Sequence, residues 1–283
     1  MTMVVGVPSG IGDVSWAYSK LCNTGEPIEY EVADGWPYRT TQFLELLPGV
    51  AKATYGQFQY NEIMSFEHAT GIGDHPTWAQ VRAVSSRVLI APNRHLELGR
   101  RLEDWLPDLP TNFHYKIHIP KEDREKAFAA LRPFKPPLWG ISAASYRGSE
   151  AWKTWGREEW VRFLRRLEAE VGGTIILLGG FWDDLTHALA AEGWPELVGK
   201  TSIGTAIEIL KHLDGYIGFS SGLGILRTVL NKRVFMMWPD HQLELSTSWA
   251  PPHMLESGRY AASRWMHPDE VWVRVKLWLE TPN

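Results

Sequence analysis

The chain has 283 residues, of which 44% are hydrophobic, and a formal net charge of −4, values typical of a globular protein with room for two domains. The negative charge does not favour nucleic-acid binding, and no apolar run approaches the roughly 20 residues that span a membrane. The single cysteine, Cys22, leaves no internal disulfide or cysteine cluster for a metal, so we expect a protein of the reducing cytoplasm.

The first half of the chain alternates short apolar runs with helical patterns, and this alternation is typical of βαβ units around a parallel sheet. The apolar runs predict strands at Met3–Val7, Ile28–Val32, Ile63–Phe66, Val88–Ala91 and Tyr115–Ile119. The helical patterns cover Val14–Leu21, Thr41–Leu47, Thr77–Val84, His95–Trp105 and Lys121–Leu131.

The proline-rich stretch Arg132–Pro137 has neither pattern and is interpreted as a linker, after which the alternation begins again. Strands are predicted at Leu138–Ser142, Thr174–Leu178, Tyr216–Phe219 and Val234–Trp238. Helices are predicted at Glu158–Val171, around Ile207, Leu210 and Leu213, at Ile225–Leu230 and at Asp269–Glu280. We therefore predict a first domain over residues 1–132, a second over residues 138–265 and a closing helix over residues 266–283.

Glycine-rich turns make two aspartates candidate site residues. Gly10-Ile11-Gly12-Asp13 follows the first strand, where a carboxylate faces the crevice in which open α/β sheets bind ligands. Helix capping by Asp13 explains the same pattern. A second copy of the tetrad ends at Asp74 and is the rival candidate, although Asp74 also suits an ordinary turn.

In the second half, Ser220-Ser221-Gly222-Leu223-Gly224 joins an apolar run to a helical pattern. A helix that begins on small residues presents unpaired backbone N–H groups and partial positive charge, which suit a phosphate. Small residues also serve simply to turn a chain, so the pattern alone leaves both interpretations open.

Four motifs together resemble glycosyltransferase family 9, the ADP-heptose heptosyltransferases of lipopolysaccharide assembly. They are Gly10–Asp13, Lys153-Thr154-Trp155-Gly156, Gly199–Ser202 and Gly218–Gly222. The resemblance implies an α/β protein of the GT-B fold, in which two Rossmann-like, doubly wound domains face each other across a cleft. It also implies an acceptor-binding N-terminal domain and a C-terminal domain that binds the nucleotide sugar.

The resemblance implies that Asp13 is the catalytic aspartate and that Lys153 binds donor phosphate. Beside these two, we predict donor contacts from residues of the same loops and from the end of the Val234–Trp238 strand, and acceptor contacts from the first domain. The predicted donor set is Ser145, Arg147, Lys153, Thr201, Ser220, Ser221, Gly222, Leu223, Gly224, Trp238 and His241, and the acceptor set is Gly10, Ile11, Gly12 and Arg94.

Two departures from the family pattern lie at the predicted donor turn. Ser220 stands where the family has an aspartate, and Leu223-Gly224-Ile225 replaces a segment that contains a histidine. The sequence therefore predicts a nucleotide-diphosphate sugar as co-substrate without favouring heptose.

The expected chemistry is sugar transfer with inversion, because one carboxylate can act as base but retention by double displacement needs a second, nucleophilic one. Asp183 and Asp184 are adjacent, do not form an Asp-x-Asp metal motif, and are better explained by helix capping. We therefore expect neither a metal nor a cofactor.

Two alternatives remain open at this stage. Arg87, Arg94, Arg100 and Arg101 could follow the phosphates of DNA, as an enzyme that glycosylates hydroxymethylated bases requires. Alternatively, loss of the family's aspartate and histidine could leave a sugar-nucleotide-binding protein without catalysis. The sequence does not predict the sugar, the acceptor or the oligomeric state.

Overall fold

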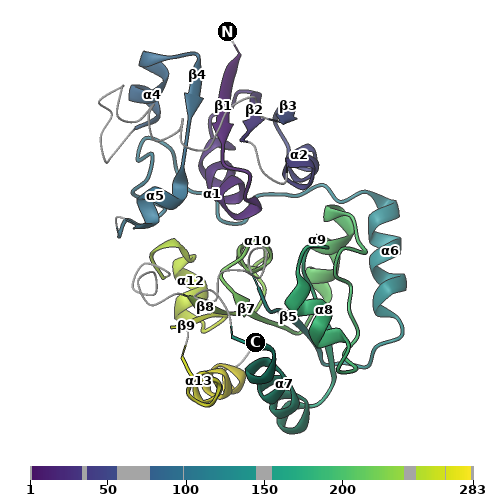
Figure 1. Cartoon of the computed structure of the whole chain (residues 1–283). Coiled ribbons are helices and arrows are strands. Elements are labelled where there is room, and N and C mark those ends of the chain that lie inside the picture. The colour runs from purple at the N-terminus through teal and green to yellow at the C-terminus, as the bar shows by residue number, and fades with distance from the viewer. Residues whose placement is uncertain are drawn as a thin grey trace. The chain divides into compact units, whose positions relative to one another are not determined.

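The computed structural model describes residues 2–33, 37–55, 77–97, 99–144, 155–238, 247–264 and 266–281. Their contacts divide the chain into two compact units between His118 and Ile119. Each unit contains one sheet in which all the paired strands are parallel. The predicted βαβ alternation is therefore confirmed in both halves (Figure 1).

The sheet of the first unit has the strand order β3-β2-β1-β4. Its strands are β1 (Met3–Val7), β2 (Ile28–Val32), β3 (Val50–Tyr55) and β4 (Arg87–Leu89). The helices described in this unit are α1 (Ile11–Leu21), α2 (Pro37–Glu45), α4 (Trp78–Val84) and α5 (Pro92–Glu97). The predicted strand Ile63–Phe66 lies outside the described residues.

Two predictions for the first unit are wrong. The helix expected over His95–Trp105 ends at Glu97, and Gly99 then adopts a φ of 72°, a left-handed conformation that closes a helix. Tyr115–Ile119 forms no strand. Instead the Tyr115 hydroxyl lies 2.6 Å from the Ser15 hydroxyl on α1, so tertiary hydrogen bonds order this segment without a sheet.

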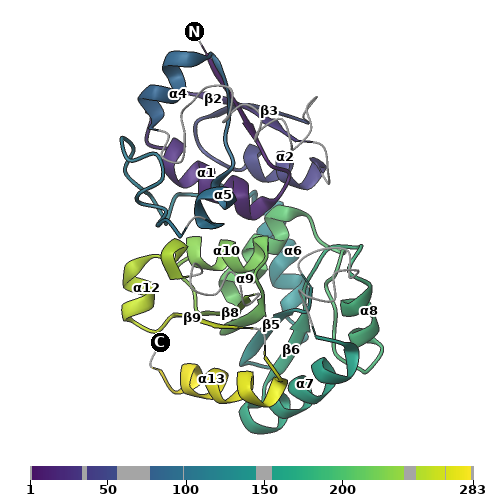
Figure 2. The ribbon, with the colours of Figure 1, turned by 60° about the vertical axis from the view of Figure 1, so that its left-hand side comes forward.

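The sheet of the second unit has the order β6-β5-β7-β8-β9. Its strands are β5 (Leu138–Ser142), β6 (Thr174–Leu177), β7 (Gly215–Phe219), β8 (Val234–Trp238) and β9 (Tyr260–Arg264). The helices described here are α6 (Lys121–Leu131), α7 (Arg157–Val171), α8 (Asp184–Ala190), α9 (Ile203–His212), α10 (Gly222–Val229), α12 (Pro252–Glu256) and α13 (Pro268–Glu280) (Figure 2).

Strand β7 shows how this unit buries both faces of its sheet. Successive side chains of a strand point to opposite faces. Ile217 and Phe219 join the apolar cluster that contains residues of α7 and α13. Tyr216 points to the other face, where an added Cβ at Gly224 of α10 would lie 3.5 Å from its ring. Burial on both faces explains why β7 reads as a continuous apolar run.

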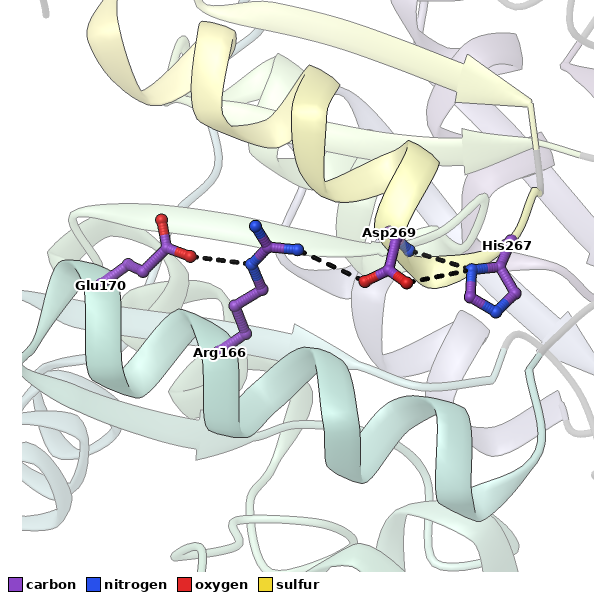
Figure 3. Close-up of polar contacts among 4 residues, drawn as sticks. All are labelled: Arg166, Glu170, His267 and Asp269. Carbon is purple, nitrogen blue, oxygen red and sulfur yellow. Dashed lines mark hydrogen bonds and ion pairs between the residues drawn. The ribbon is translucent and has the colours of Figure 1, made fainter.

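Exposed polar contacts join the closing helix α13 to α7 (Figure 3). The Arg166 guanidinium donates to Glu170 at 2.7 Å and to Asp269 at 3.3 Å, while His267 Nδ1 accepts from the Asp269 N–H at 3.4 Å. Because such exposed pairs contribute little, the buried Val271, Trp272 and Val275 supply most of the attachment of α13.

Helix α6 belongs to the second unit, so the division lies before the linker that we predicted at Arg132–Pro137. The Asp123 carboxylate accepts hydrogen bonds from the hydroxyls of Ser202, at 2.5 Å, and Thr205, at 2.7 Å. A Cβ added to Gly204 would lie 2.3 Å from the same carboxylate, so glycine is needed for this approach. These contacts fix α6 to the beginning of α9.

The capping role predicted for the acidic pair is confirmed. Asp183 precedes α8, and its carboxylate accepts from the Thr186 N–H at 3.0 Å. Burial raises the pKa of Asp183, while the hydrogen bonds from Thr186 lower it.

Among the described residues, no helix combines the length and apolarity that crossing a membrane requires.

The link between α6 and α9 predicts a difference between two neighbouring acidic residues. Asp123→Ala removes two hydrogen bonds to a carboxylate and leaves the N-terminus of α9 without its nearby negative charge. We therefore expect the free energy of unfolding to fall by about 1.5–3 kcal/mol. Glu122→Ala is the control, since Glu122 is 76% exposed and pairs with Lys126 on its own helix. This substitution should lower the free energy of unfolding by less than about 0.5 kcal/mol. Thermal and urea unfolding measure both. Equal losses would contradict the assigned role of Asp123.

Candidate functional site

Strand order identifies the switch point of the first sheet. The chain runs from β1 to β2 and β3 on one side of the sheet and then places β4 on the other side of β1. Open α/β sheets bind ligands at the carboxyl ends of the strands where the order reverses, which here is between β1 and β4. The turn at Gly10–Asp13 follows β1, and α5, which carries the backbone of Arg94, follows β4.

Asp13 lies in the first turn of α1, at the positively polarised end of that helix. The N-cap is Gly10, so Asp13 is not itself the N-cap residue. A Cβ added to Gly10 would lie 2.6 Å from Asp13 Oδ2, so the first glycine of the tetrad makes room for the carboxylate.

The chain before this tetrad is held by α2. The buried hydroxyl of Thr40 donates to the Ser9 carbonyl at 2.5 Å. One residue further on, the Gly10 carbonyl accepts from the Val14 N–H at 3.1 Å, which is the first hydrogen bond of α1. These two bonds fix the path of the backbone between β1 and Asp13.

The second unit repeats this arrangement. Its first strand is β5, with β6 on one side and β7 on the other, so the order reverses between β5 and β7. The turn Ser220–Gly224 follows β7 directly, and the stretch that contains Lys153 follows β5. In sequence, both stretches therefore follow the two strands that define the switch point of this sheet.

Close packing holds the donor turn against the sheet. The Ser220 N–H donates to the Met237 carbonyl of β8 at 2.9 Å. A Cβ added to Gly224 would lie 2.3 Å from Met236 Sδ, so a larger residue here would force the Met236 side chain to move. Ile225, which replaces the family's histidine, is 6% exposed, so its side chain contributes packing at this position.

Trp155, the first described residue after Ala144, packs in the core of the second unit. Its ring lies 4.9 Å from that of Trp160 and 6.2 Å from that of Phe219, between ring centroids, and its indole N–H donates to the Met266 carbonyl at 2.7 Å. Phe219 is the residue before Ser220. The tryptophan of the Lys-x-Trp motif is therefore a core residue beside the donor turn.

The beginnings of α9 and α10 differ in a way that bears on phosphate binding. Ser202 caps α9 by accepting from the Thr205 N–H at 3.0 Å, and the Asp123 carboxylate lies at the same end. At α10 the N-cap Ser221 makes no side-chain cap hydrogen bond. The N-terminus of α9 thus has an anion of its own, whereas the amides of α10 are not capped by Ser221. Thr201, partly buried, precedes this α9 cap.

Several predicted site residues lie outside the described residues: Asp74, Ser145, Arg147, Lys153, His241 and the side chain of Arg94. Trp238 is described and is 3% exposed, with its indole N–H donating to the Tyr260 hydroxyl at 3.1 Å. The Trp238 ring therefore belongs to the core, although it lies at the end of β8.

Three contacts around the site were missed by sequence reasoning: Thr40 with Ser9, Asp123 with α9, and Tyr216 with Ser221, whose hydroxyl oxygens are 3.2 Å apart. For the contact between Tyr216 and Ser221, the sequence offered one signal, a tyrosine in a short apolar strand that is followed by two serines. The other two contacts join segments that are distant in the sequence.

The basic residues of the DNA alternative are partly paired within the first unit. Arg87 contacts Glu31 at 2.8 Å, and Arg101 contacts Glu103 at 3.3 Å. Arg100 lies 3.4 Å from the buried His95 ring. Within the described ranges, no group of three or more histidine, cysteine, aspartate or glutamate residues is arranged to hold a metal ion.

Comparison with solved structures confirms the predicted GT-B fold. The chain aligns with E. coli ADP-heptose lipopolysaccharide heptosyltransferase II at a TM-score of 0.66 and 14% identity, covering 99% of this chain and 98% of that one. A family 9 glycosyltransferase from Veillonella parvula aligns at a TM-score of 0.61 and 13% identity, with 97% and 89% covered. E. coli heptosyltransferase WaaC with ADP gives 0.58 and 14%, with 98% and 100% covered.

No curated protein sequence matches the chain significantly. Residues 67–260, more than half of the chain, match the family model of glycosyltransferase family 9 (heptosyltransferase). This stretch includes Trp155, the Gly199–Ser202 motif and the turn before α10, whose geometry is described above. The chain therefore belongs to glycosyltransferase family 9 and is a glycosyltransferase.

Proposed function

We propose that this glycosyltransferase transfers a sugar, with inversion and without a metal ion, from a nucleotide-diphosphate sugar to a hydroxyl group of a lipopolysaccharide-type glycan. The proposal rests on the switch points of the two sheets. In the first unit, Asp13 lies in the first turn of α1, and in the second unit the N-cap serine of α10 makes no side-chain cap hydrogen bond. A base and a diphosphate-binding group are the two functions that this transfer needs. We also propose a cytoplasmic location, on the basis of the single cysteine.

In this proposal Asp13 is the general base. Deprotonation of the acceptor hydroxyl as it attacks the anomeric carbon requires a carboxylate within hydrogen-bond reach of that hydroxyl. The position of Asp13 after β1, at the edge where open sheets bind ligands, supports this role.

The donor diphosphate is proposed to bind at the beginning of α10. Negative charge grows on the bridging oxygen as the sugar leaves, and backbone N–H groups of Gly222, Leu223 and Gly224 are suited to stabilise it. The proposal adds Lys153 and Arg147 as the cations that neutralise the leaving group, with Ser145 and Thr201 as further contacts. Trp155, two residues after Lys153 in the sequence, supports it because its ring lies 6.2 Å from that of Phe219, the residue before Ser220.

The sugar and the base of the donor are matters for a binding screen. Ser220 and the buried Ile225 occupy the two positions at which the chain departs from the family pattern, so we propose a nucleotide-diphosphate sugar as the class and do not restrict it to heptose. A thermal-shift screen of ADP-, UDP- and GDP-sugars identifies the donor, because a bound ligand stabilises the folded protein by mass action.

The base assignment predicts different outcomes for the two glycine tetrads. Asp13→Asn should lower transfer by about 10²- to 10⁴-fold, since the amide accepts no proton, while leaving the affinity for the nucleoside diphosphate product nearly unchanged. Asp74→Asn is the matched control and should change transfer less than threefold. Release of nucleoside diphosphate in the presence of glycan acceptor measures both variants. Full activity in Asp13→Asn with loss in Asp74→Asn would move the base to Asp74.

The mechanism predicts two properties of the wild-type reaction. Transfer should proceed unchanged in EDTA, because the sequence has no Asp-x-Asp motif and the proposal uses side-chain cations and amides at the diphosphate. Proton NMR of the first-formed product should show the anomeric configuration opposite to that of the donor. Activity that EDTA abolishes and Mg²⁺ restores, or a retained configuration, would contradict the corresponding part of the mechanism.

A further inference from the structure

Tyr216 occupies a slot that glycines make between β5, β7 and α10. Cβ atoms added to Gly140, Gly218 and Gly224 would lie 3.3, 3.2 and 3.5 Å from its ring carbons. Gly140 is also the register partner of Tyr216 across the β5–β7 pair. The side chain is fully buried, so its ring is held at the switch point.

The Tyr216 hydroxyl lies next to Ser221, in the turn before α10. Its oxygen is 3.2 Å from Ser221 Oγ, and Ser142, the last residue of β5, lies close enough to lower the pKa of Tyr216. Burial raises the pKa of Tyr216 to about 12, against the smaller opposing effect of these two serines, so the hydroxyl keeps its proton at neutral pH. The phenol thus lies close to the ends of the two strands that define the switch point.

The effect of this contact is visible by comparison with α9. Ser202 and Ser221 are both serine N-caps with extended backbone conformation, at φ −64° and −146°. Ser202 caps its helix through its hydroxyl, whereas Ser221 makes no cap hydrogen bond and contacts Tyr216 instead. An N-cap serine normally accepts from the second or third amide of its helix, here Leu223 or Gly224.

We propose that Tyr216 is a positioning residue for donor binding: its hydroxyl holds the Ser221 side chain away from the first turn of α10, so that the amides there remain available to a diphosphate. The proposal rests on the donor site proposed above and adds a residue that acts through Ser221. Without the phenol hydroxyl, Ser221 is released to cap α10, and an incoming diphosphate must displace that bond. A serine cap of ordinary strength corresponds to about a fivefold loss of affinity.

A double-mutant cycle tests this role. Inorganic pyrophosphate and ADP are titrated into wild type, Tyr216→Phe, Ser221→Ala and the double variant by calorimetry. Tyr216→Phe should weaken binding about three- to tenfold in the wild-type background and have no effect in the Ser221→Ala background, where no cap can form. Tyr260→Phe is the control, because it removes another buried tyrosine hydroxyl of the same sheet, and it should leave pyrophosphate affinity unchanged.

Amide hydrogen exchange without ligand gives an independent readout. In Tyr216→Phe, exchange at Leu223 or Gly224 should slow severalfold as Ser221 begins to cap, and the double variant should lose this protection. If Tyr216→Phe binds pyrophosphate and ADP with wild-type affinity, and its α10 amides exchange at the wild-type rate, the proposal for Tyr216 is wrong while the donor site stands. An affinity loss that persists in the Ser221→Ala background also overturns it, because the tyrosine would then act by packing. Wild type that binds neither pyrophosphate nor ADP overturns the donor site and this inference together.

Discussion

The order of the strands is the constraint on which the rest of this structure depends. In each sheet the chain places its second strand on one side of the first and later returns to the other side, so two loops leave the carboxyl edge in opposite directions. The two helices that begin at these edges, α1 at Ile11 and α10 at Gly222, then present polarised backbone groups there. The sheets therefore determine where these two helices begin.

Close approach is the second requirement, and glycine meets it repeatedly. Gly10 accommodates the Asp13 carboxylate, Gly224 allows α10 to contact Met236, and Gly204 receives Asp123. At each position a methyl group would lie within 2.6 Å of another atom, closer than side chains tolerate. The glycines thus set the distance between helix starts and their surroundings.

Much of the fold could be predicted from apolar periodicity, because buried strands such as Met3–Val7 and Leu138–Ser142 read as continuous apolar runs. The edge strands β3 and β9 were missed, since VAKATY and YAASR mix polar and small residues. The domain boundary was misplaced because the attachment of α6 depends on Asp123 and Ser202, 79 residues apart. For the candidate site, the glycine pattern indicated Asp13 and the turn before α10, whose roles stay predictions, whereas the contacts of Thr40 and Tyr216 require the folded chain. The role of Lys153 stays a prediction.

The bond between Trp155 and the Met266 carbonyl gives the C-terminal helix an unexpected importance. Met266 lies two residues before α13, so the tryptophan of the Lys-x-Trp motif donates a hydrogen bond to the backbone just before this helix. Truncations of α13, or fusions that displace it, would here disturb the hydrogen bond that holds Trp155. An expression tag on this enzyme belongs at a position that leaves α13 docked on α7.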